Sequence, residues 1–419
     1  MIYEFNFKNY RSYKNEATIV FTAKPLREFD NSLIRVVENV KLIPVCAIYG
    51  PNGGGKSSVL MALCSLRNIV VEPILQLAFM KKKNEELAET TINQLREGIS
   101  ERHIESSFYK WDEQSKDEPT EYSILFQMEN YKYRYELSVF NDVIYMENLY
   151  YETEEGEIEA VFERDEDGVY LCDEINVLDI NNMNESLPLL SYIFMFKNIE
   201  VVDRAVQFFL QIKNINFDKP RQDRKILVEQ IEKDKRRICN ILQSMGIDIL
   251  DIRIDYEDNG EIREIYTKHR LNNGLEKELC LYEESSGTRK VISIIPMILQ
   301  GIEQNCLVLI DELDAKLHPL LLAKIIEMFT DKNINQESAQ LLFTSHDLTT
   351  MSNEVFRRDE IWFSAINGYD ESVLYSLVDF RKEDGKKPRN DENYSKQYLE
   401  GRYGADPYMR RIKDWEVVD

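Results

Sequence analysis

A glycine-rich segment near the N-terminus has the residue types and spacing of a phosphate-binding loop. Gly50 to Ser57 fit the pattern GxxxxGK[ST], between a buried strand predicted at 43–49 and a helix predicted from about 56 to 67. Glycines let consecutive backbone N–H groups surround phosphate oxygens, the lysine reaches the β- and γ-phosphates, and the hydroxyl binds Mg²⁺. The residues predicted to bind nucleotide here are Gly50, Pro51, Asn52, Gly53, Gly54, Gly55, Lys56, Ser57 and Ser58.

The run from Cys306 to Glu312 ends in two acids after five apolar residues. Such a strand delivers an aspartate to the Mg²⁺ shell at the carboxyl edge of a parallel sheet, so we expect Asp311 and Ser57 to hold the metal. Glu312 could orient and activate an attacking water, the alternative being a solvated strand end. More than half of the chain separates Lys56 from Asp311, which implies a large insertion.

His346 follows a third apolar strand, predicted at 341–345. A neutral imidazole at the end of a core strand could bond a γ-phosphate oxygen or the attacking water, whereas the alternative is a cap on the next helix. The other histidines, His103, His269 and His318, have no comparable position. We therefore expect Lys56, Glu312 and His346 to be catalytic.

The segment ESSGTRK at 284–290 precedes an apolar helix about twenty residues before the strand that carries Asp311. A small, hydroxyl-rich helix N-terminus can bind an anion. Taken alone, the segment is better explained as a helix cap, and only its place among the other motifs favours a functional role.

Composition limits the class of protein. Six cysteines occur without a CxxC pair, which favours reduced thiols and a cytoplasmic location. The apolar runs predict neither a membrane span nor a secretory signal. The formal net charge is −23, but residues 101–190 contain 24 acidic and 6 basic residues, so the acidity belongs mainly to one region.

Hydrophobic periodicity divides the chain into five regions. An N-terminal lobe of a split nucleotide domain spans 1–70, and a helical segment spans 71–120. An antiparallel β region covers 121–187, and a helical insertion covers 188–247. The C-terminal lobe, 248–419, again alternates strand, helix and strand, as expected for a parallel sheet completed from both ends of the chain.

Five motifs together resemble the ordered motifs of ABC-type ATPase heads, as in the SMC and RecF group of DNA-repair ATPases. They are NYRS at 9–12, GPNGGGKSS at 50–58, ESSGTRK at 284–290, LVLIDELD at 307–314 and LLFTSHD at 341–347. The resemblance implies an α/β P-loop NTPase of the ABC-ATPase head type, with a mixed sheet, an antiparallel β subdomain and a helical insertion. It also implies ATP and Mg²⁺ as cofactors.

The same resemblance assigns further residues. Ser285, Ser286 and Gly287 occupy the position of the signature motif, which reaches the partner's γ-phosphate in an ATP-sandwich homodimer. Asp314 falls in the D-loop, and Arg11 could contact the nucleotide. Two departures are the sequence SSG in place of SGG and the lack of a clear Q-loop glutamine, for which Gln127 is only a candidate.

DELDAKLHP, FTSHD, RRDEIWF at 357–363 and YLEGRYGADP at 398–407 resemble the stand-alone AAA-family proteins typified by AbiLi and RloA. That resemblance implies a role in prokaryotic anti-phage defence and abortive infection, beside a neighbour-encoded effector of Toprim-like or RloB type. The homodimer could assemble further.

One alternative function and two interpretations of the acidic segment remain open. The chain could be a DNA-binding repair or maintenance ATPase that contacts nucleic acid through the basic positions of 221–237 and 381–389. The acidic segment 152–174 is a solvated surface in the simpler interpretation, and a platform for a basic partner or a mimic that repels DNA in the other.

Overall fold

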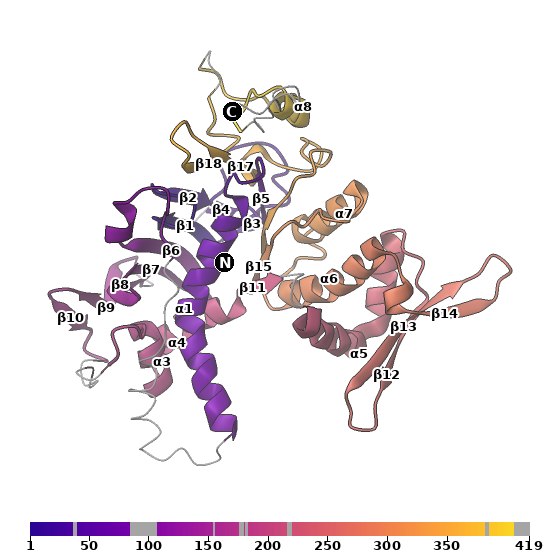
Figure 1. The fold of residues 1–419 in the computed structure, drawn as a ribbon, viewed down its shortest axis with the longest axis horizontal. Coiled ribbons are helices and arrows are strands. Elements are labelled where there is room, and N and C mark those ends of the chain that lie inside the picture. Colours follow the sequence, from indigo (N-terminus) through magenta and orange to yellow (C-terminus); the bar gives the residue numbers. More distant parts are fainter. Residues whose placement is uncertain are drawn as a thin grey trace, which may run out of the picture.

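The computed structural model describes residues 1–36, 40–83, 107–153, 156–175, 180, 183–215, 220–381 and 385–405. A six-stranded central sheet carries the segments that could do chemistry (Figure 1). Its order is β11 (Lys213–Ile215), β15 (Leu307–Ile310), β16 (Gln340–Thr344), β5 (Val45–Tyr49), β17 (Ile361–Ile366) and β18 (Ser372–Ser376). Neighbouring strands are parallel except β17 and β18.

The strand order explains how distant motifs meet. β5 comes from the first fifty residues and lies between β16 and β17, which come from the last hundred. Because β5, β15 and β16 are parallel, their carboxyl ends lie at the same edge of the sheet. The segments after these three strands are therefore neighbours in space.

A second, seven-stranded sheet is antiparallel. Its order is β10 (Gly168–Leu171), β9 (Ile158–Asp165), β8 (Val143–Glu152), β7 (Tyr131–Phe140), β6 (Thr120–Met128), β1 (Ile2–Lys8) and β2 (Ala17–Val20). The antiparallel region thus extends beyond the predicted 121–187, because β1 pairs with β6, as in Phe5 opposite Ile124. Periodicity within a segment does not reveal a partner more than a hundred residues away.

Helices cover both faces of the central sheet (Figure 1). Helices α1 (Lys56–Lys83), α3 (Leu189–Phe196) and α4 (Glu200–Gln211) share one hydrophobic core with the antiparallel sheet. Helices α5 (Pro220–Ser244), α6 (Ser286–Glu303) and α7 (Pro319–Thr330) belong to the other core. Alternate residues of β5 enter opposite cores, Cys46 the first and Ala47 the second, as the twofold periodicity of a strand requires.

Helix α1 is longer than expected. The sequence predicted an end near Arg67, but α1 continues through Pro73 to Lys83, so the predicted boundary at residue 70 falls inside a helix. Proline removes one helical hydrogen bond, and burial of neighbours such as Val70 and Ile74 offsets that loss. By length and composition, Lys56–Phe79 could cross a membrane, but 61% of its most apolar window is buried, and a core helix passes the same test.

Helix α5 also differs from expectation. The sequence predicted a helical insertion at 188–247 with basic positions at 221–237, whereas α5 packs beside α6 and contributes Leu227, Ile231 and Ile238 to the second core. A three-stranded sheet, β12 (Asp251–Tyr256), β13 (Ile262–Arg270) and β14 (Glu276–Cys280), projects beyond these helices (Figure 1). The smaller elements are β3 (Ile34–Arg35), β4 (Lys41–Leu42), α8 (Tyr394–Leu399) and the 3-10 turns Ser115–Asp117, Leu281–Glu283 and Arg358–Glu360.

Candidate nucleotide-binding site

The glycine loop joins β5 to α1, and residues of β17 and β18 pack closely against it. A Cβ atom on Gly50 would lie 2.0 Å from the Ser364 carbonyl oxygen on β17, and one on Gly55 would lie 2.5 Å from Ser372 Oγ. Both glycines also have positive φ, +151° and +97°, which favours glycine. Ser364 Oγ donates to the Gly54 carbonyl oxygen at 2.5 Å and fixes the loop further. The backbone shape therefore requires glycine on both steric and conformational grounds.

Lys56, the first residue of α1, is buried among the loop's own carbonyl groups. Its Nζ donates to the carbonyl oxygens of Gly50 and Pro51, each at 3.0 Å. Burial lowers the pKa of Lys56, while the nearby carboxylates of Asp311 and Glu312 oppose that shift. The ammonium group is thus held at the loop by neutral acceptors that a phosphate oxygen could replace.

A hydroxyl and a carboxylate meet beside the loop. Ser57 Oγ donates to Asp311 Oδ1 at 3.0 Å, and Thr344 Oγ1, at the end of β16, donates to the same oxygen at 2.5 Å. Thr344 Oγ1 also accepts from the Glu312 N–H at 2.8 Å. Thr344 was missed from the sequence, although its position just before Ser345 and His346 at a strand end was a usable signal.

This pair of oxygens fits Mg²⁺. The ion prefers oxygen ligands, and in phosphate sites it commonly takes one or two from protein and the rest from water and phosphate. Within the described ranges, no group of three or more His, Cys, Asp or Glu side chains could hold a metal. Ser57 and Asp311 together present a hydroxyl and a carboxylate oxygen that could hold Mg²⁺ beside a bound phosphate.

Lys290, on α6, holds Glu312 and the turn that follows it. Glu312 has φ +48°, a left-handed conformation that costs an L-residue about 1–2 kcal/mol. Lys290 Nζ donates to the carbonyl oxygens of Glu312, Leu313 and Ala315 at 3.0, 3.0 and 2.7 Å. Burial lowers the pKa of Lys290 to about 8. In the sequence, Lys290 is recognisable only as part of ESSGTRK, and nothing there indicates this contact.

Asp314 ties the same turn to the segment after β16. Its Oδ2 accepts from the His346 N–H at 3.1 Å, and its buried Oδ1 has no hydrogen-bond partner among the described residues. His346 itself is exposed. Asp314, the predicted D-loop residue, and His346, a predicted catalytic residue, are therefore direct neighbours within one chain.

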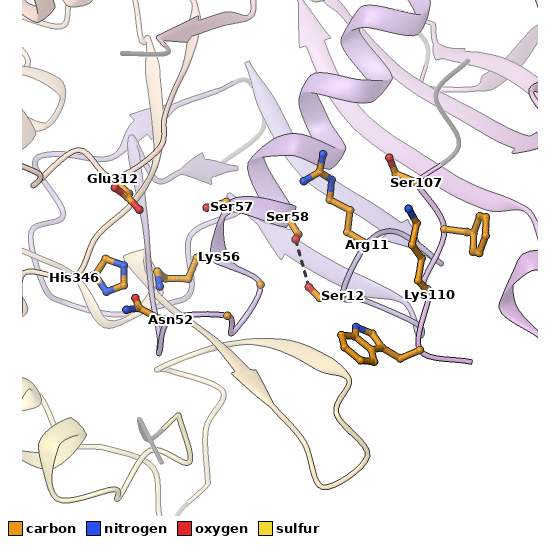
Figure 2. Close-up of a pocket in the computed structure, with 14 residues that line it drawn as sticks. Arg11, Ser12, Asn52, Lys56, Ser57, Ser58, Ser107, Lys110, Glu312 and His346 are labelled. Carbon is orange, nitrogen blue, oxygen red and sulfur yellow. Dashed lines mark hydrogen bonds between the residues drawn. The ribbon is translucent and has the colours of Figure 1, made fainter. Parts of the chain in front are cut away.

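These groups border a cleft of about 840 Å³ (Figure 2). Figure 2 shows Glu312, His346, Lys56 and Asn52 toward one end and Arg11, Ser107 and Lys110 toward the other. The predicted residues that line the cleft are Arg11, Asn52, Gly53, Gly55, Lys56, Ser57, Ser58, Glu312 and His346. The other loop residues, Gly50, Pro51 and Gly54, lie behind the cleft lining. Asp311 bonds the lining residue Ser57.

One side of the cleft was missed from the sequence. Ser107, Phe108, Lys110 and Trp111 line it, and the Trp111 side chain is 81% exposed. The Arg11 N–H donates to the Ser107 carbonyl oxygen at 2.6 Å, which joins this segment to the N-terminal loop. An exposed aromatic ring facing a phosphate site can stack on a nucleotide base.

The predicted signature residues lie outside this cleft. Among the described residues, the cleft lining does not include Ser285, Ser286 or Gly287. Ser285 Oγ accepts from the Thr288 N–H at 3.1 Å, so the helix-cap interpretation holds in structural terms. A Cβ on Gly287 would lie 2.9 Å from the Lys316 carbonyl oxygen, so the predicted signature residues lie beside the segment that follows Asp314 in the same chain.

Gln127 does not act as a Q-loop residue in this structure. It lies on β6, where Oε1 accepts from the Tyr3 hydroxyl at 2.5 Å and Nε2 donates to the Glu129 carbonyl oxygen at 2.8 Å. Within the described part of the chain, it is not a cleft residue. A strand position with both amide groups satisfied has a structural role.

A buried strand, a glycine loop, a helix that begins with lysine and an acid-terminated neighbouring strand define a P-loop nucleoside triphosphatase. The family model described as "AAA domain, putative AbiEii toxin, Type IV TA system" matches residues 45–352, and the chain belongs to this family. The predicted α/β fold class, with its mixed sheet, antiparallel region and helical insertion, is confirmed. Membership also implies use of a nucleotide, typically with Mg²⁺.

Solved structures give weaker likenesses. The SMC head domain from Thermotoga maritima is 12% identical, with 90% of this chain and 98% of that chain covered and a TM-score of 0.41. An Smc head bound to the C-winged helix domain of ScpA is 14% identical, with 90% and 98% covered and a TM-score of 0.44. An Smc head domain from Pyrococcus furiosus, bound to the C-terminal domain of ScpA, is 13% identical, with 90% and 96% covered and a TM-score of 0.39. Comparison with curated proteins gave no match.

Proposed function

We propose that the protein is an ABC-class ATPase that binds and hydrolyses ATP, closes as a homodimer around it, and acts as a switch on a partner effector in prokaryotic anti-phage defence. The observation that carries the catalytic part is the meeting of Lys56, Glu312 and His346 around one cleft, with the Ser57–Asp311 pair at its wall.

Each residue has a role that its position supports. Lys56 would exchange two loop carbonyl groups for phosphate oxygens, and Ser57 and Asp311 would hold Mg²⁺, which offsets phosphate charge when bound. The Glu312 carboxylate would accept a proton from the attacking water. The exposed His346 imidazole would bond the terminal phosphate. Trp111 would stack on the base, with Arg11 and Lys110 beside it.

A second copy of the chain would complete the site. Ser285 and Ser286 are exposed at the N-terminus of α6, where backbone N–H groups attract anions, yet they lie outside the chain's own cleft. In a head-to-head dimer these residues would reach the nucleotide bound by the partner. If ATP binds the closed form about 100-fold more tightly than the open form, the bias is about 2.7 kcal/mol, enough to control an effector.

The defence setting rests on family relationships. The description of the matched family names a putative AbiEii toxin and a type IV TA system. The resemblance of the 311–319, 357–363 and 398–407 motifs to AbiLi and RloA supports abortive infection in the bacterial cytoplasm, with a Toprim-like or RloB-type effector encoded nearby.

The decisive variant is Glu312→Gln, which preserves shape and removes the base. We expect it to bind ATP, to hydrolyse it about 100-fold or more slowly, and to accumulate as dimer. Turnover and light scattering with and without Mg-ATP, alone and with the neighbour-encoded protein, measure this. Glu261→Gln, an exposed turn residue, is the matched control. Turnover of Glu312→Gln at the wild-type rate would show that Glu312 is not the base.

The same experiment separates the DNA-repair alternative. On α5, Lys233 and Arg237 pair with Glu303, both at 2.5 Å, whereas Arg236 is exposed. A clamp on DNA predicts that duplex DNA promotes dimerisation and turnover and that Arg236→Glu abolishes this response. The defence switch predicts that neither DNA nor Arg236→Glu changes the rate.

A further inference from the structure

A second pocket lies at the opposite edge of the central sheet. Its volume is about 540 Å³, and it lies between the C-terminal half of α7, the 354–355 segment and the loop before β3. Glu360, which lines it, directly precedes β17, so the pocket is at the amino edge, whereas the glycine loop follows the carboxyl end of β5. The two sites therefore occupy opposite ends of the same strands.

The lining is strongly acidic. Four carboxylic acids and one lysine line the pocket: Glu327, Asp331, Glu354, Glu360 and Lys332. A second lysine, Lys324, lies outside the lining and pairs with Glu327 at 2.6 Å. The last turn of α7 ends at the pocket with Thr330, and it adds the negative end of the helix dipole. Phe29, 44% exposed, offers an aromatic face in the same lining. The acidic side chains, the helix dipole and the aromatic face all favour binding of a cation.

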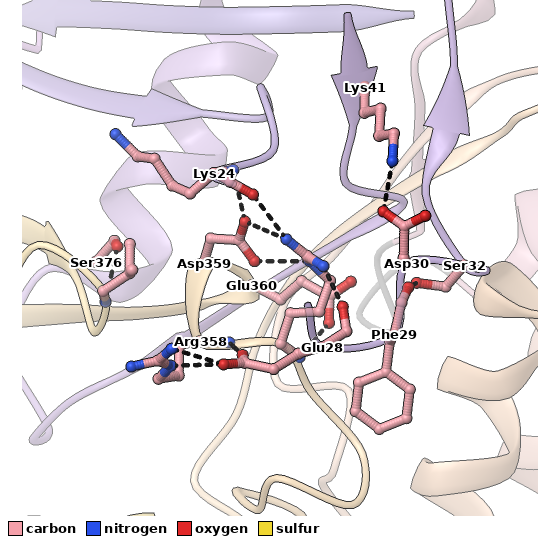
Figure 3. A network of polar contacts seen from close by, with 12 residues as sticks. Lys24, Glu28, Phe29, Asp30, Ser32, Lys41, Arg358, Asp359, Glu360 and Ser376 are labelled. Carbon is pink, nitrogen blue, oxygen red and sulfur yellow. Dashed lines mark hydrogen bonds and ion pairs between the residues drawn. The ribbon is translucent and has the colours of Figure 1, made fainter. Parts of the chain in front are cut away.

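Glu360 points to a ligand independently of the surface charge. Its side chain is buried, with 1% exposed, and Oε2 accepts from the Arg357 N–H at 2.8 Å, but Oε1 has no partner among the described residues. Figure 3 draws Glu360 together with Glu28, Phe29 and Ser32 of the N-terminal segment. A buried carboxyl oxygen without a donor costs free energy that a bound donor would recover.

We propose that this pocket binds the ammonium or guanidinium group of an organic cation, presented by a lysine or arginine side chain of a partner protein or by a free polyamine. Both groups are donors without acceptors, so they match Glu360 Oε1 and the surrounding carboxylates. The aromatic face of Phe29 suits either group. The proposal does not depend on ATP hydrolysis.

Binding should release a proton. Burial raises the pKa of Glu360 to about 8, and Asp359 and Glu28 add to the shift while Arg357 opposes it. The other charged groups around the pocket are Glu327, Asp331, Lys332 and Glu354. Lys324 pairs with Glu327 and Arg358 pairs with Glu28, and the Cys46 thiol of β5 lies on the buried side of Glu360. Near neutral pH the carboxyl is mostly protonated, and an adjacent cation favours the ionised form. The proton then passes to solvent.

Calorimetry tests the proposal. Wild-type protein is titrated with spermidine, with agmatine and with a blocked glycine peptide that contains one lysine, in two buffers of different ionisation enthalpy near neutral pH. We expect binding with release of up to about one proton, seen as a buffer-dependent heat. Tighter binding of the peptide identifies a protein side chain as the source, and tighter binding of spermidine identifies a polyamine. Absence of binding for all three at millimolar concentration would overturn the proposal.

Two variants keep the test specific. Glu360→Gln should weaken binding about tenfold or more and remove the proton release. Glu354→Gln, at the exposed rim, should weaken binding about threefold and keep the proton release, which guards against a folding defect at Glu360. Glu261→Gln should bind like wild type. Equal affinity of wild type, Glu360→Gln and Glu354→Gln would refute this site.

Discussion

The two edges of the central sheet use charged residues in opposite ways. At the carboxyl edge, Lys56 bonds only neutral carbonyl groups, and Glu312 faces an open cleft. At the amino edge, Arg357 has no exposed surface and makes a two-point ion pair with Asp359 at 2.9 Å for each bond (Figure 3). At the carboxyl edge the charged groups border an open cleft, whereas at the amino edge the Arg357–Asp359 pair joins parts of the chain beside the second pocket.

The amino-edge ion pair anchors the N-terminal segment. Arg357 also donates to the carbonyl oxygens of Lys24, at 3.1 Å, and Glu28, and the Lys24 N–H donates to Asp359 Oδ2 at 2.8 Å. Arg358 pairs with Glu28 at 2.7 Å. The RRDEIWF motif is thus, in its first three residues, a structural clamp. Charge alone does not identify a site, because the partners of each charge decide its role.

The largest effect should come from breaking that clamp. Arg357→Met leaves Asp359 buried without its counter-ion, and such a loss costs about 3–5 kcal/mol. Urea unfolding measures the change. The control is Arg389→Met, whose ion pair with Asp391 is exposed, with an expected cost of about 1 kcal/mol or less. Equal, small losses of stability in Arg357→Met and Arg389→Met would show that the buried ion pair at the amino edge contributes no more than an exposed one.

The next effect should appear at the carboxyl edge in ligand binding. Lys56→Ala removes the ammonium group that would replace two carbonyl acceptors with phosphate oxygens, so ATP affinity should fall about 100-fold or more. Equilibrium binding of a fluorescent ATP analogue checks this, with Lys324→Ala on the exposed face of α7 as control. Stability should change little, and a large loss of stability with retained binding would contradict the assignment of this edge to ligand binding.

The smallest of the three effects concerns the base. If Trp111 stacks on adenine, Trp111→Ala should weaken ATP binding about tenfold, since stacking of one base contributes about 1–3 kcal/mol. Trp111→Phe should restore most of the affinity. Tyr369→Ala, 83% exposed, provides a control for loss of a surface aromatic ring. Unchanged affinity in Trp111→Ala would remove the base-stacking role and leave the phosphate contacts intact.

The sequence predicted the carboxyl edge well because its signals are local. Each of the three motifs is a strand followed directly by its polar residues, and parallel pairing then brings Lys56, Asp311 and His346 together. Thr344 offered a local signal at the end of its strand, whereas Trp111 was missed because its place at the cleft depends on neighbours distant in sequence. The amino-edge network and the pairing of β1 with β6 were missed for the same reason. The extension of α1 past Pro73 depends on burial, which local propensity does not report.

Lys290 links the start of α6 to the turn that contains Glu312. It lies one helical turn beyond the signature residues on α6, and its ammonium group holds three carbonyl oxygens of the turn that contains Glu312. Because Lys290 bonds this turn from α6, a shift of α6 would also move the turn. In the proposed homodimer, contact of a second copy with the start of α6 would be transmitted to Glu312 of this chain, so the docking of one subunit would control the timing of hydrolysis in the other.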